Sequence, residues 1–281
     1  MIFAPPPEFG FYFHSHETTR PSATWGELVT ASGSADTYGS YTEIISDADL
    51  TEDCYGIAIW ISSAAVSAAI SRGSITIGKD EAGGTSYSDW LTDLICGNAQ
   101  NILSGNGGNF YYFPMFIKAG TSIAAKYANS TGSRTCRVAI AVVGRPLGSD
   151  VRAATKFESF GASVAAGTAI TPANASEGSW TQIGSNPSTP LWWWQYGYQI
   201  ANATINLRAF FVDIAVGDGS NKHIIIENQH VLTDSTEALY HGNVARLIPC
   251  YEAAVGDLIY ARVNCDAAPD ASNQIAIYGC G

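Results

Sequence analysis

The chain has 281 residues, with 25 acidic against 14 basic side chains and a formal net charge of −11. A surface of this sign repels phosphate backbones, and since lysine and arginine form no cluster, we expect no nucleic-acid partner. The longest apolar stretches, such as residues 138–143, are far shorter than the roughly 18–20 residues of a spanning helix, which argues against membrane insertion. The first residues lack the basic start and apolar core of a signal peptide, so we expect folding in a cytoplasm.

Residues 1–24 are predicted to form an extended N-terminal arm. The three prolines at residues 5–7 disfavour helix and favour an extended polyproline conformation. The side chains of Phe9, Phe11 and Phe13 follow and would be costly to leave in water. Two placements stay open, because these rings either pack back on the first domain or dock on a neighbouring subunit.

A short framework occurs twice along the chain. The pattern Gly-x-x-Ile-x-Ala followed by a basic residue is found at residues 120–126 and again at residues 256–262. Each copy is followed by an apolar segment that ends in glycine, at Gly144 and at Gly279. The repeat predicts an internal duplication of one structural unit.

The duplication divides the chain into two tandem domains, residues 25–149 and residues 150–281. We align Trp25 with Trp180 as the residues that open the first strand of each copy. This alignment gives the first copy an insertion around residues 36–53.

Apolar residues alternate with a period of two in both copies, as at Ile57, Ile59 and Ile61. Such alternation is typical of a strand with one face on a core. Runs of glycine and asparagine separate the segments, as at residues 105–109, and mark turns. The pattern predicts an all-β protein made of two antiparallel β-sandwiches of jelly-roll type.

Three consecutive tryptophans stand out in the second copy. Successive side chains of a strand point to opposite faces, so the three rings cannot all enter one core. At least one ring must meet a neighbouring domain, a partner subunit or a ligand, and exposed aromatic rings are found both in protein interfaces and in sugar-binding platforms. The candidate interface or glycan-contact residues are Trp192, Trp193, Trp194, Tyr196 and Tyr198.

No metal or cofactor site is predicted. His14 and His16 share a face of an extended strand, but they lack further ligands at a matching spacing. His223, His230 and His241 lie in a region that we expect to be rich in loops. The acidic residues between Asp47 and Asp53 lack the glycine turn and terminal glutamate of an EF-hand.

The six cysteines form no CxxC pair, so we expect reduced, buried thiols. A disulfide from Cys265 to Cys250 or to Cys280 is the alternative. Lys126 and Arg262 close the two copies of the repeated pattern, and we interpret them as outward-facing basic side chains of a strand. Because no nucleophile, base or phosphate-binding motif accompanies them, we predict no catalytic residues and no enzymatic activity.

The segment from Tyr112 to Lys126, with Gly144 closing the domain, resembles a β-sandwich module of structural proteins in tailed-bacteriophage particles. That family carries a Pro-x-Phe-Ile-Pro-Ala-Gly-Thr-Arg-Ile-Ala-Ala-Arg hairpin, preceded by an Asp-Ile-Gly-x-Gly strand. The second copy departs from this hairpin at residues 254–256. The resemblance implies a non-enzymatic virion component and supplies no catalytic residue.

The resemblance therefore predicts a structural virion protein that folds in the host cytoplasm. We expect it in the tail, the tail tip or a fibre, with capsid decoration on the head as the alternative. The expected partners are further copies of itself, with a trimer implied by the family, and other virion proteins. A carbohydrate-binding module for host attachment is the competing class of function, with a host surface glycan bound at the tryptophan run.

Overall fold

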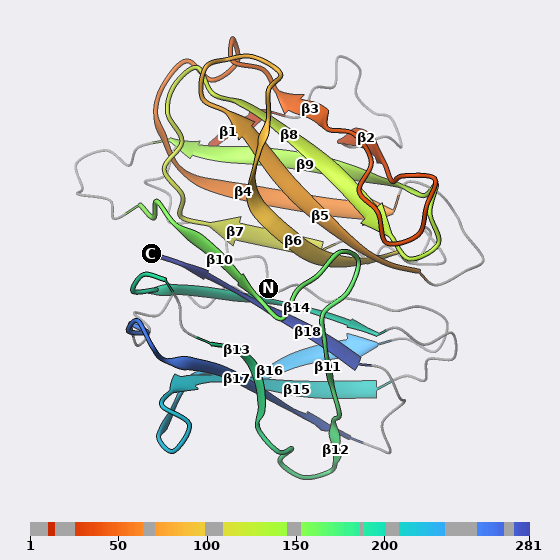
Figure 1. The fold of residues 1–281 in the computed structure, drawn as a ribbon, viewed down its shortest axis with the longest axis vertical. Coiled ribbons are helices and arrows are strands. Elements are labelled where there is room, and N and C mark those ends of the chain that lie inside the picture. The colour runs from red at the N-terminus through yellow and green to blue at the C-terminus, as the bar shows by residue number, and fades with distance from the viewer. Residues whose placement is uncertain are drawn as a thin grey trace.

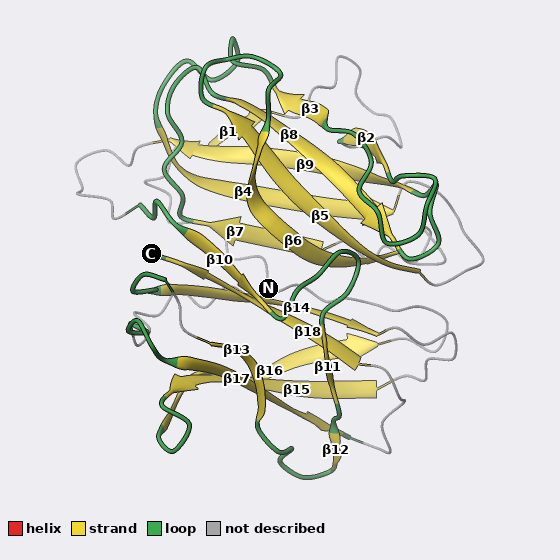
Figure 2. Ribbon diagram, in the orientation of Figure 1, coloured by secondary structure: helices red, strands yellow, loops and turns green. Residues whose placement is uncertain are grey.

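The computed structural model describes residues 11–14, 26–63, 71–98, 109–144, 153–185, 188–200, 208–233, 252–266 and 273–281. All regular structure in these ranges is β-strand, which confirms the predicted all-β class (Figure 2). The strands form four sheets that pack as two β-sandwiches, one above the other in Figure 1. Among the described strands and turns there is no helix of the length and hydropathy needed to cross a membrane.

The first sandwich has the jelly-roll strand order. In one sheet β1 and β2 both pair with β9, which is followed by β4 and β7, and the other sheet has the order β3, β8, β5, β6. From β2 onward, successive strands alternate between the two sheets except for β5 and β6, which form a hairpin within one sheet, and this is the strand order of a jelly roll. The strands are β1 Phe11–His14, β2 Glu27–Thr30, β3 Thr42–Ile45, β4 Cys54–Ser63, β5 Ser71–Asp80, β6 Ser88–Asn98, β7 Asn109–Phe113, β8 Ser122–Asn129 and β9 Thr135–Gly144.

The second sandwich repeats this pattern of pairing. In one sheet β10, β11 and β14 pair with β18, and in the other β12 and β13 pair with β17, followed by β15 and β16. The predicted boundary near residue 150 falls in residues 145–152, which lie outside the described ranges. The strands are β10 Phe157–Phe160, β11 Thr168–Ile170, β12 Ala173–Asn174, β13 Thr181–Ser185, β14 Trp193–Ile200, β15 Arg208–Gly217, β16 Lys222–Thr233, β17 Leu258–Cys265 and β18 Asn273–Cys280.

Alternate side chains of the central strands fill the two cores. Ile57 and Ile59 of β4 are fully buried in the first sandwich, and Ile275 and Ile277 of β18 are fully buried in the second. Each such side chain contributes roughly 1.5–3 kcal/mol by leaving water. The period-two alternation in the sequence is thus a correct signal for which face of each strand lies inside.

The register of strand pairing shows which residues of the two halves correspond. Thr42 lies opposite Ala125 and Thr181 lies opposite Ala261, and in both pairs of strands a bulge follows one residue later. The hexapeptide at residues 39–44, Gly-Ser-Tyr-Thr-Glu-Ile, therefore corresponds to Gly-Ser-Trp-Thr-Gln-Ile at residues 178–183.

This correspondence corrects the alignment of Trp25 with Trp180. The strand after Trp25 is β2, which pairs with β9, whereas Trp180 precedes β13, which pairs with β17. The true counterpart of Trp180 is Tyr41, and with that alignment the first half carries no insertion at residues 36–53. The alignment of the two tryptophans is wrong because each of them stands just before a short strand, and the two strands do not correspond.

A second irregularity recurs at corresponding positions. Asp93 in β6 and Asn228 in β16 both have left-handed backbone, with φ of 56° and 49°. The N–H of Asp93 donates to Thr76 Oγ1 at 3.1 Å, and the N–H of Asn228 donates to Asp213 Oδ1 at 2.6 Å. Different side chains thus hold the same bulge, which supports the internal duplication that the sequence predicts.

Part of the predicted N-terminal arm is a strand of the first sandwich. The backbone of β1 pairs antiparallel with β9, with Phe11 opposite Val143 and Phe13 opposite Ala141. The sequence leaves two placements open for the arm, and the pairing of β1 with β9 corresponds to packing back on the first domain. Phe9 lies outside the described residues.

Candidate functional site

At the contact between the two sandwiches, edge strands of the first sandwich lie against the outer surface of a sheet of the second sandwich. In Figure 1, β6 and β7 of the upper sandwich lie next to β14 and β18 of the lower one. The inner faces of β14 and β18 belong to the second core, so their outer faces are free to contact the first sandwich. We call this region the interdomain contact.

The side-chain amide of Gln195 takes the place of a neighbouring strand along β7. Its Oε1 accepts the N–H of Tyr112 at 2.9 Å, and its Nε2 donates to the carbonyl of Phe110 at 3.2 Å. Trp193 Nε1 donates to the carbonyl of Tyr112 at 3.1 Å, and the two rings meet edge-on at 5.6 Å. Because unpaired backbone groups at a sheet edge invite pairing with other chains, these bonds close the edge of β7.

The hydroxyl of Tyr278 likewise takes the place of a neighbouring strand along β6. It accepts the N–H of Ile95 at 2.8 Å and donates to the carbonyl of Asp93 at 2.9 Å. Tyr111 adds a bond from its hydroxyl to the carbonyl of Ile95 at 2.5 Å, and its ring meets that of Tyr278 at 88°. Burial raises the pKa of Tyr278 well above its usual value, so the phenol keeps the proton it donates.

A glycine allows the two surfaces to approach this closely. A Cβ at Gly197 would lie 2.4 Å from Cγ1 of Ile95 and 2.7 Å from the hydroxyl oxygen of Tyr111. Neither distance is compatible with a side chain, so position 197 in the middle of β14 requires glycine for the interdomain contact.

The predicted aromatic run is divided between the two cores. Trp193 packs with the core of the first sandwich, and the half-buried Trp192 lies against the same cluster. Trp194, Tyr196 and Tyr198 point the other way, into the core of the second sandwich. This division follows from strand alternation, and it places the run within and between the two domains, not on an exposed platform.

Lys126 sits among aromatic and acidic side chains from other strands. Its Nζ lies 4.9 Å from the ring centre of Tyr41 and 5.0 Å from that of Tyr38. It also donates to Asp89 Oδ1 at 2.6 Å. Burial raises the pKa of Asp89, but the hydrogen bonds from Lys126 and Tyr41 outweigh it, and the net shift is downward.

Arg262 has the corresponding surroundings in the second sandwich. Its guanidinium carbon lies 4.5 Å from the ring centre of Trp180. Its Nε donates a hydrogen bond to Asp213 Oδ2 at 2.8 Å. Its Nη2 forms ion pairs with Asp213 Oδ2 at 2.8 Å and with Glu177 Oε2 at 2.5 Å. The basic residue of the repeated sequence pattern is therefore held by an aromatic ring and carboxylates in both halves, a role that the sequence alone did not indicate.

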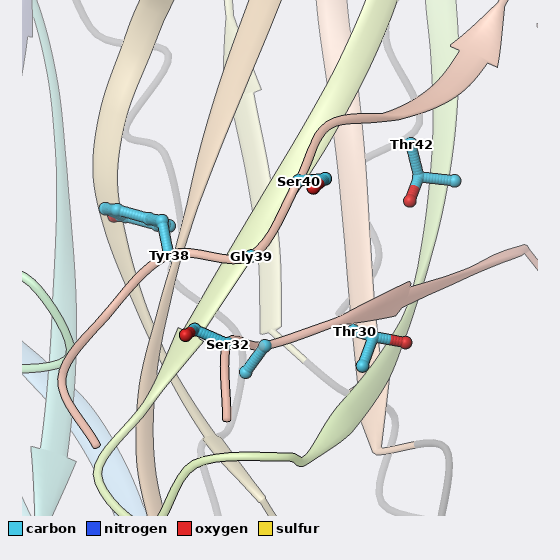
Figure 3. Close-up of a pocket in the computed structure, with 7 residues that line it drawn as sticks. Thr30, Ser32, Tyr38, Gly39, Ser40 and Thr42 are labelled. Atoms are coloured by element: carbon cyan, nitrogen blue, oxygen red, sulfur yellow. The ribbon is translucent and has the colours of Figure 1, made fainter. Parts of the chain in front are cut away.

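An open hollow of about 500 Å³ lies beside the segment that carries Tyr41 (Figure 3). Hydroxyl groups dominate its lining, and it contains no ionisable group other than a tyrosine. The lining residues are Thr30, Ala31, Ser32, Tyr38, Gly39, Ser40 and Thr42.

The histidines and acidic residues form no site in the described ranges. His223 and His230 lie exposed on strand β16, which corrects the expectation of a loop-rich region. Asp49 accepts from Ser46 Oγ at 2.7 Å, and Asp53 accepts the N–H of Ala119 at 2.8 Å. In the ranges that the structure describes, no three potential metal ligands come together, while His16 and His241 fall outside those ranges.

The cysteines that the structure describes are buried and carry no disulfide. Burial raises the pKa of the Cys54 thiol to about 11. Cys265 and Cys280 carry no disulfide, so neither of the alternative bridges forms, and Cys250 lies outside the described residues.

No protein-family model matches the chain, and no curated protein sequence matches it. A solved structure of PNGF-II in space group P21 is 9% identical, with a TM-score of 0.40, and the match covers 97% of this chain and 66% of that one. A crystal structure of tripeptidyl peptidase 2 (TPP II) is 7% identical, with a TM-score of 0.25, and the match covers 98% of this chain and 23% of that one. The chain thus spans less than two thirds of either structure, and a likeness this low carries no argument about function.

Proposed function

We propose that this chain is a non-enzymatic structural protein of a tailed phage particle, in which the two joined sandwiches serve as one stiff building block. The observation that carries the proposal is the interdomain contact. Side chains of the second sandwich, above all Gln195 and Tyr278, form hydrogen bonds with backbone groups of β6 and β7, two of the edge strands of the first. A unit of this kind transmits load between its ends and keeps two of its strand edges from pairing with other chains.

The polar residues of the repeated pattern support the same proposal. Lys126 is bonded to Asp89 and Arg262 is bonded to Asp213, so both basic groups hold strands of their own sandwich together. The resemblance of residues 112–126 to phage β-sandwich modules supplies the context of the particle. A tail, tail-tip or fibre position is the proposed place, and decoration of the head is the alternative.

The proposed partners are other copies of the chain and neighbouring virion proteins. The sugar-binding alternative at Trp193 and Trp194 loses support, because Trp194 is only 1% exposed and Trp193 is 9% exposed. A sugar ring cannot stack on an aromatic face that other side chains already cover.

Immunogold labelling of purified particles tests the proposal. Gold at the tail or its tip is the expected result, and gold over the head would move the protein to capsid decoration. Absence of the chain from a denaturing gel of the same particles would contradict the virion assignment altogether.

A further inference from the structure

Two tyrosines cross the outer face of the β3-β8-β5-β6 sheet in opposite directions. Tyr41 precedes β3, and its hydroxyl donates to Asp89 Oδ1 on β6 at 2.5 Å. Tyr87 precedes β6, and its hydroxyl donates to Glu43 Oε2 on β3 at 2.7 Å. The ring centres are 5.3 Å apart with 48° between the planes. The two rings and two carboxylates form what we call the tyrosine clasp.

Small residues beneath the clasp let the rings lie across the sheet. Glu43 pairs with Ala124, Ala124 with Gly78, and Gly78 with Asp89, so the two carboxylates stand at the ends of one cross-strand row. A Cβ at Gly78 would lie 2.5 Å from Cε1 of Tyr41, which shows that the ring rests against the backbone there. The result is a fixed aromatic surface that is partly open to solvent.

Each carboxylate of the clasp keeps one oxygen free. Asp89 uses Oδ1 for both Tyr41 and Lys126, and its side chain is 52% exposed. Glu43 is exposed and uses Oε2 for Tyr87. Neither Asp89 Oδ2 nor Glu43 Oε1 accepts a hydrogen bond from any residue in the described ranges. The clasp therefore presents two fixed acceptors beside two aromatic rings.

The second sandwich folds without a clasp. By the register of the strands, its counterparts of Tyr41 and Glu43 are Trp180 and Gln182. In the first sandwich Asp89 lies opposite Gly78. The corresponding residue of the second sandwich is Ile224 in β16, which lies opposite Ala215 in β15. The second sandwich keeps an aromatic ring over the basic side chain and a carboxylate bound to it, but that carboxylate comes from β15 and not from β16, so the jelly roll does not need the clasp. The extra groups of the first sandwich are available for another role.

We infer that the tyrosine clasp is a binding site for an uncharged oligosaccharide. Ring faces of tyrosine stack on the apolar faces of sugar rings, while carboxylate oxygens accept hydrogen bonds from sugar hydroxyls. The net charge of −11 disfavours an acidic glycan. A cationic ligand is disfavoured because Lys126 already lies 4.9 Å from the centre of the Tyr41 ring.

The hollow beside Tyr38 and Thr42 is not part of this site, because neither Tyr41 nor Glu43 lines it. A shallow aromatic surface with few fixed polar groups binds single sugars weakly, so we expect affinity to rise with the length of the oligosaccharide.

The inference depends only on this face of the first sandwich and not on a place in a phage particle. Gold labelling of virions and sugar binding can each succeed or fail without the other. The site also differs from the tryptophan run considered from the sequence, because it lies on the opposite sandwich.

The test is binding of the labelled full-length chain to an array of neutral oligosaccharides, followed by titration of the best ligand. Glu43→Ala removes a free acceptor and Tyr87→Leu removes a stacking ring, and each is expected to weaken binding about tenfold. Glu177→Ala, which removes an exposed acidic side chain of the second sandwich, is the matched control and should leave binding unchanged.

Thermal melts of each variant separate lost binding from lost folding, and Glu43 is exposed enough for its replacement to be tolerated. No binding to any neutral oligosaccharide at millimolar concentration would overturn the inference. Binding that Glu43→Ala and Tyr87→Leu leave unchanged would overturn it equally, because the ligand would then lie elsewhere.

Discussion

Lys126 and Arg262 occupy the same position in the two sandwiches, one opposite Thr76 and the other opposite Asp213. The difference between their partners predicts different costs of removal. Asp213 is 5% exposed at its side chain, so Arg262→Ala leaves a buried carboxylate without its cation and should destabilise the protein by about 3 kcal/mol.

Lys126→Ala is the internal comparison. Its carboxylate partner is half exposed and is rehydrated when the lysine is removed, so the expected loss is below about 1 kcal/mol. Urea unfolding of both variants measures the difference. Equal losses would show that the two basic residues are not held in the different environments described above.

Gln195→Leu tests the closure of the β7 edge. The substitution leaves the N–H of Tyr112 and the carbonyl of Phe110 without their side-chain partner, and buried groups of this kind cost about 1–3 kcal/mol together. Gln182→Leu on the exposed face of β13 is the matched control and should change the free energy of unfolding by less than about 0.5 kcal/mol. Similar losses of unfolding free energy in both variants would contradict the role of Gln195 in the interdomain contact.

Gly197→Ala tests how closely the sandwiches approach. The added methyl group would meet Ile95 and Tyr111, and overpacking of this kind costs about 1–3 kcal/mol. At Gly33 a Cβ would find its nearest contact at 3.9 Å, so Gly33→Ala serves as the control with little effect. A melting temperature for Gly197→Ala equal to that of the unchanged chain would mean that the contact is looser than described.

Alkaline pH should weaken the interdomain contact. Burial raises the pKa of Tyr112 to about 12 and that of Tyr278 further above its usual value of 10. A tyrosine whose pKa is raised by folding stabilises the folded state fully below pH 10 and loses that contribution as the pH rises through the folded-state value. Titration of tyrosinate absorbance, with circular dichroism in parallel, should show these phenols ionising only as the structure is lost. Their ionisation near pH 10 in an intact fold would contradict this burial.

The strands of the fold can be predicted from the sequence, whereas the contacts between the two halves cannot. Alternation identifies the inward residues of β4 and β18 because it depends only on neighbours along the chain. The similar hexapeptides at residues 39–44 and 178–183 are also visible in the sequence, but an alignment of the two halves by their tryptophans places Trp25, and not Tyr41, opposite Trp180.

Gln195 and Tyr278 illustrate what the sequence cannot show. Their partners Tyr112 and Ile95 lie far away along the chain, and nothing in the local pattern marks a glutamine or tyrosine that closes a distant strand edge. For the same reason the sequence does not identify Asp89 as the partner of Lys126, since the two residues come from different strands. Such pairs are fixed by packing of the folded sheets.

Calorimetric unfolding of the full chain tests the central claim that the two sandwiches form one unit. The interdomain contact predicts a single cooperative transition in which both cores melt together. Gln195→Leu combined with Gly197→Ala should split that transition in two, as each sandwich then unfolds at its own temperature. Two transitions in the unchanged chain, with neither one moved by the double substitution, would contradict the claim.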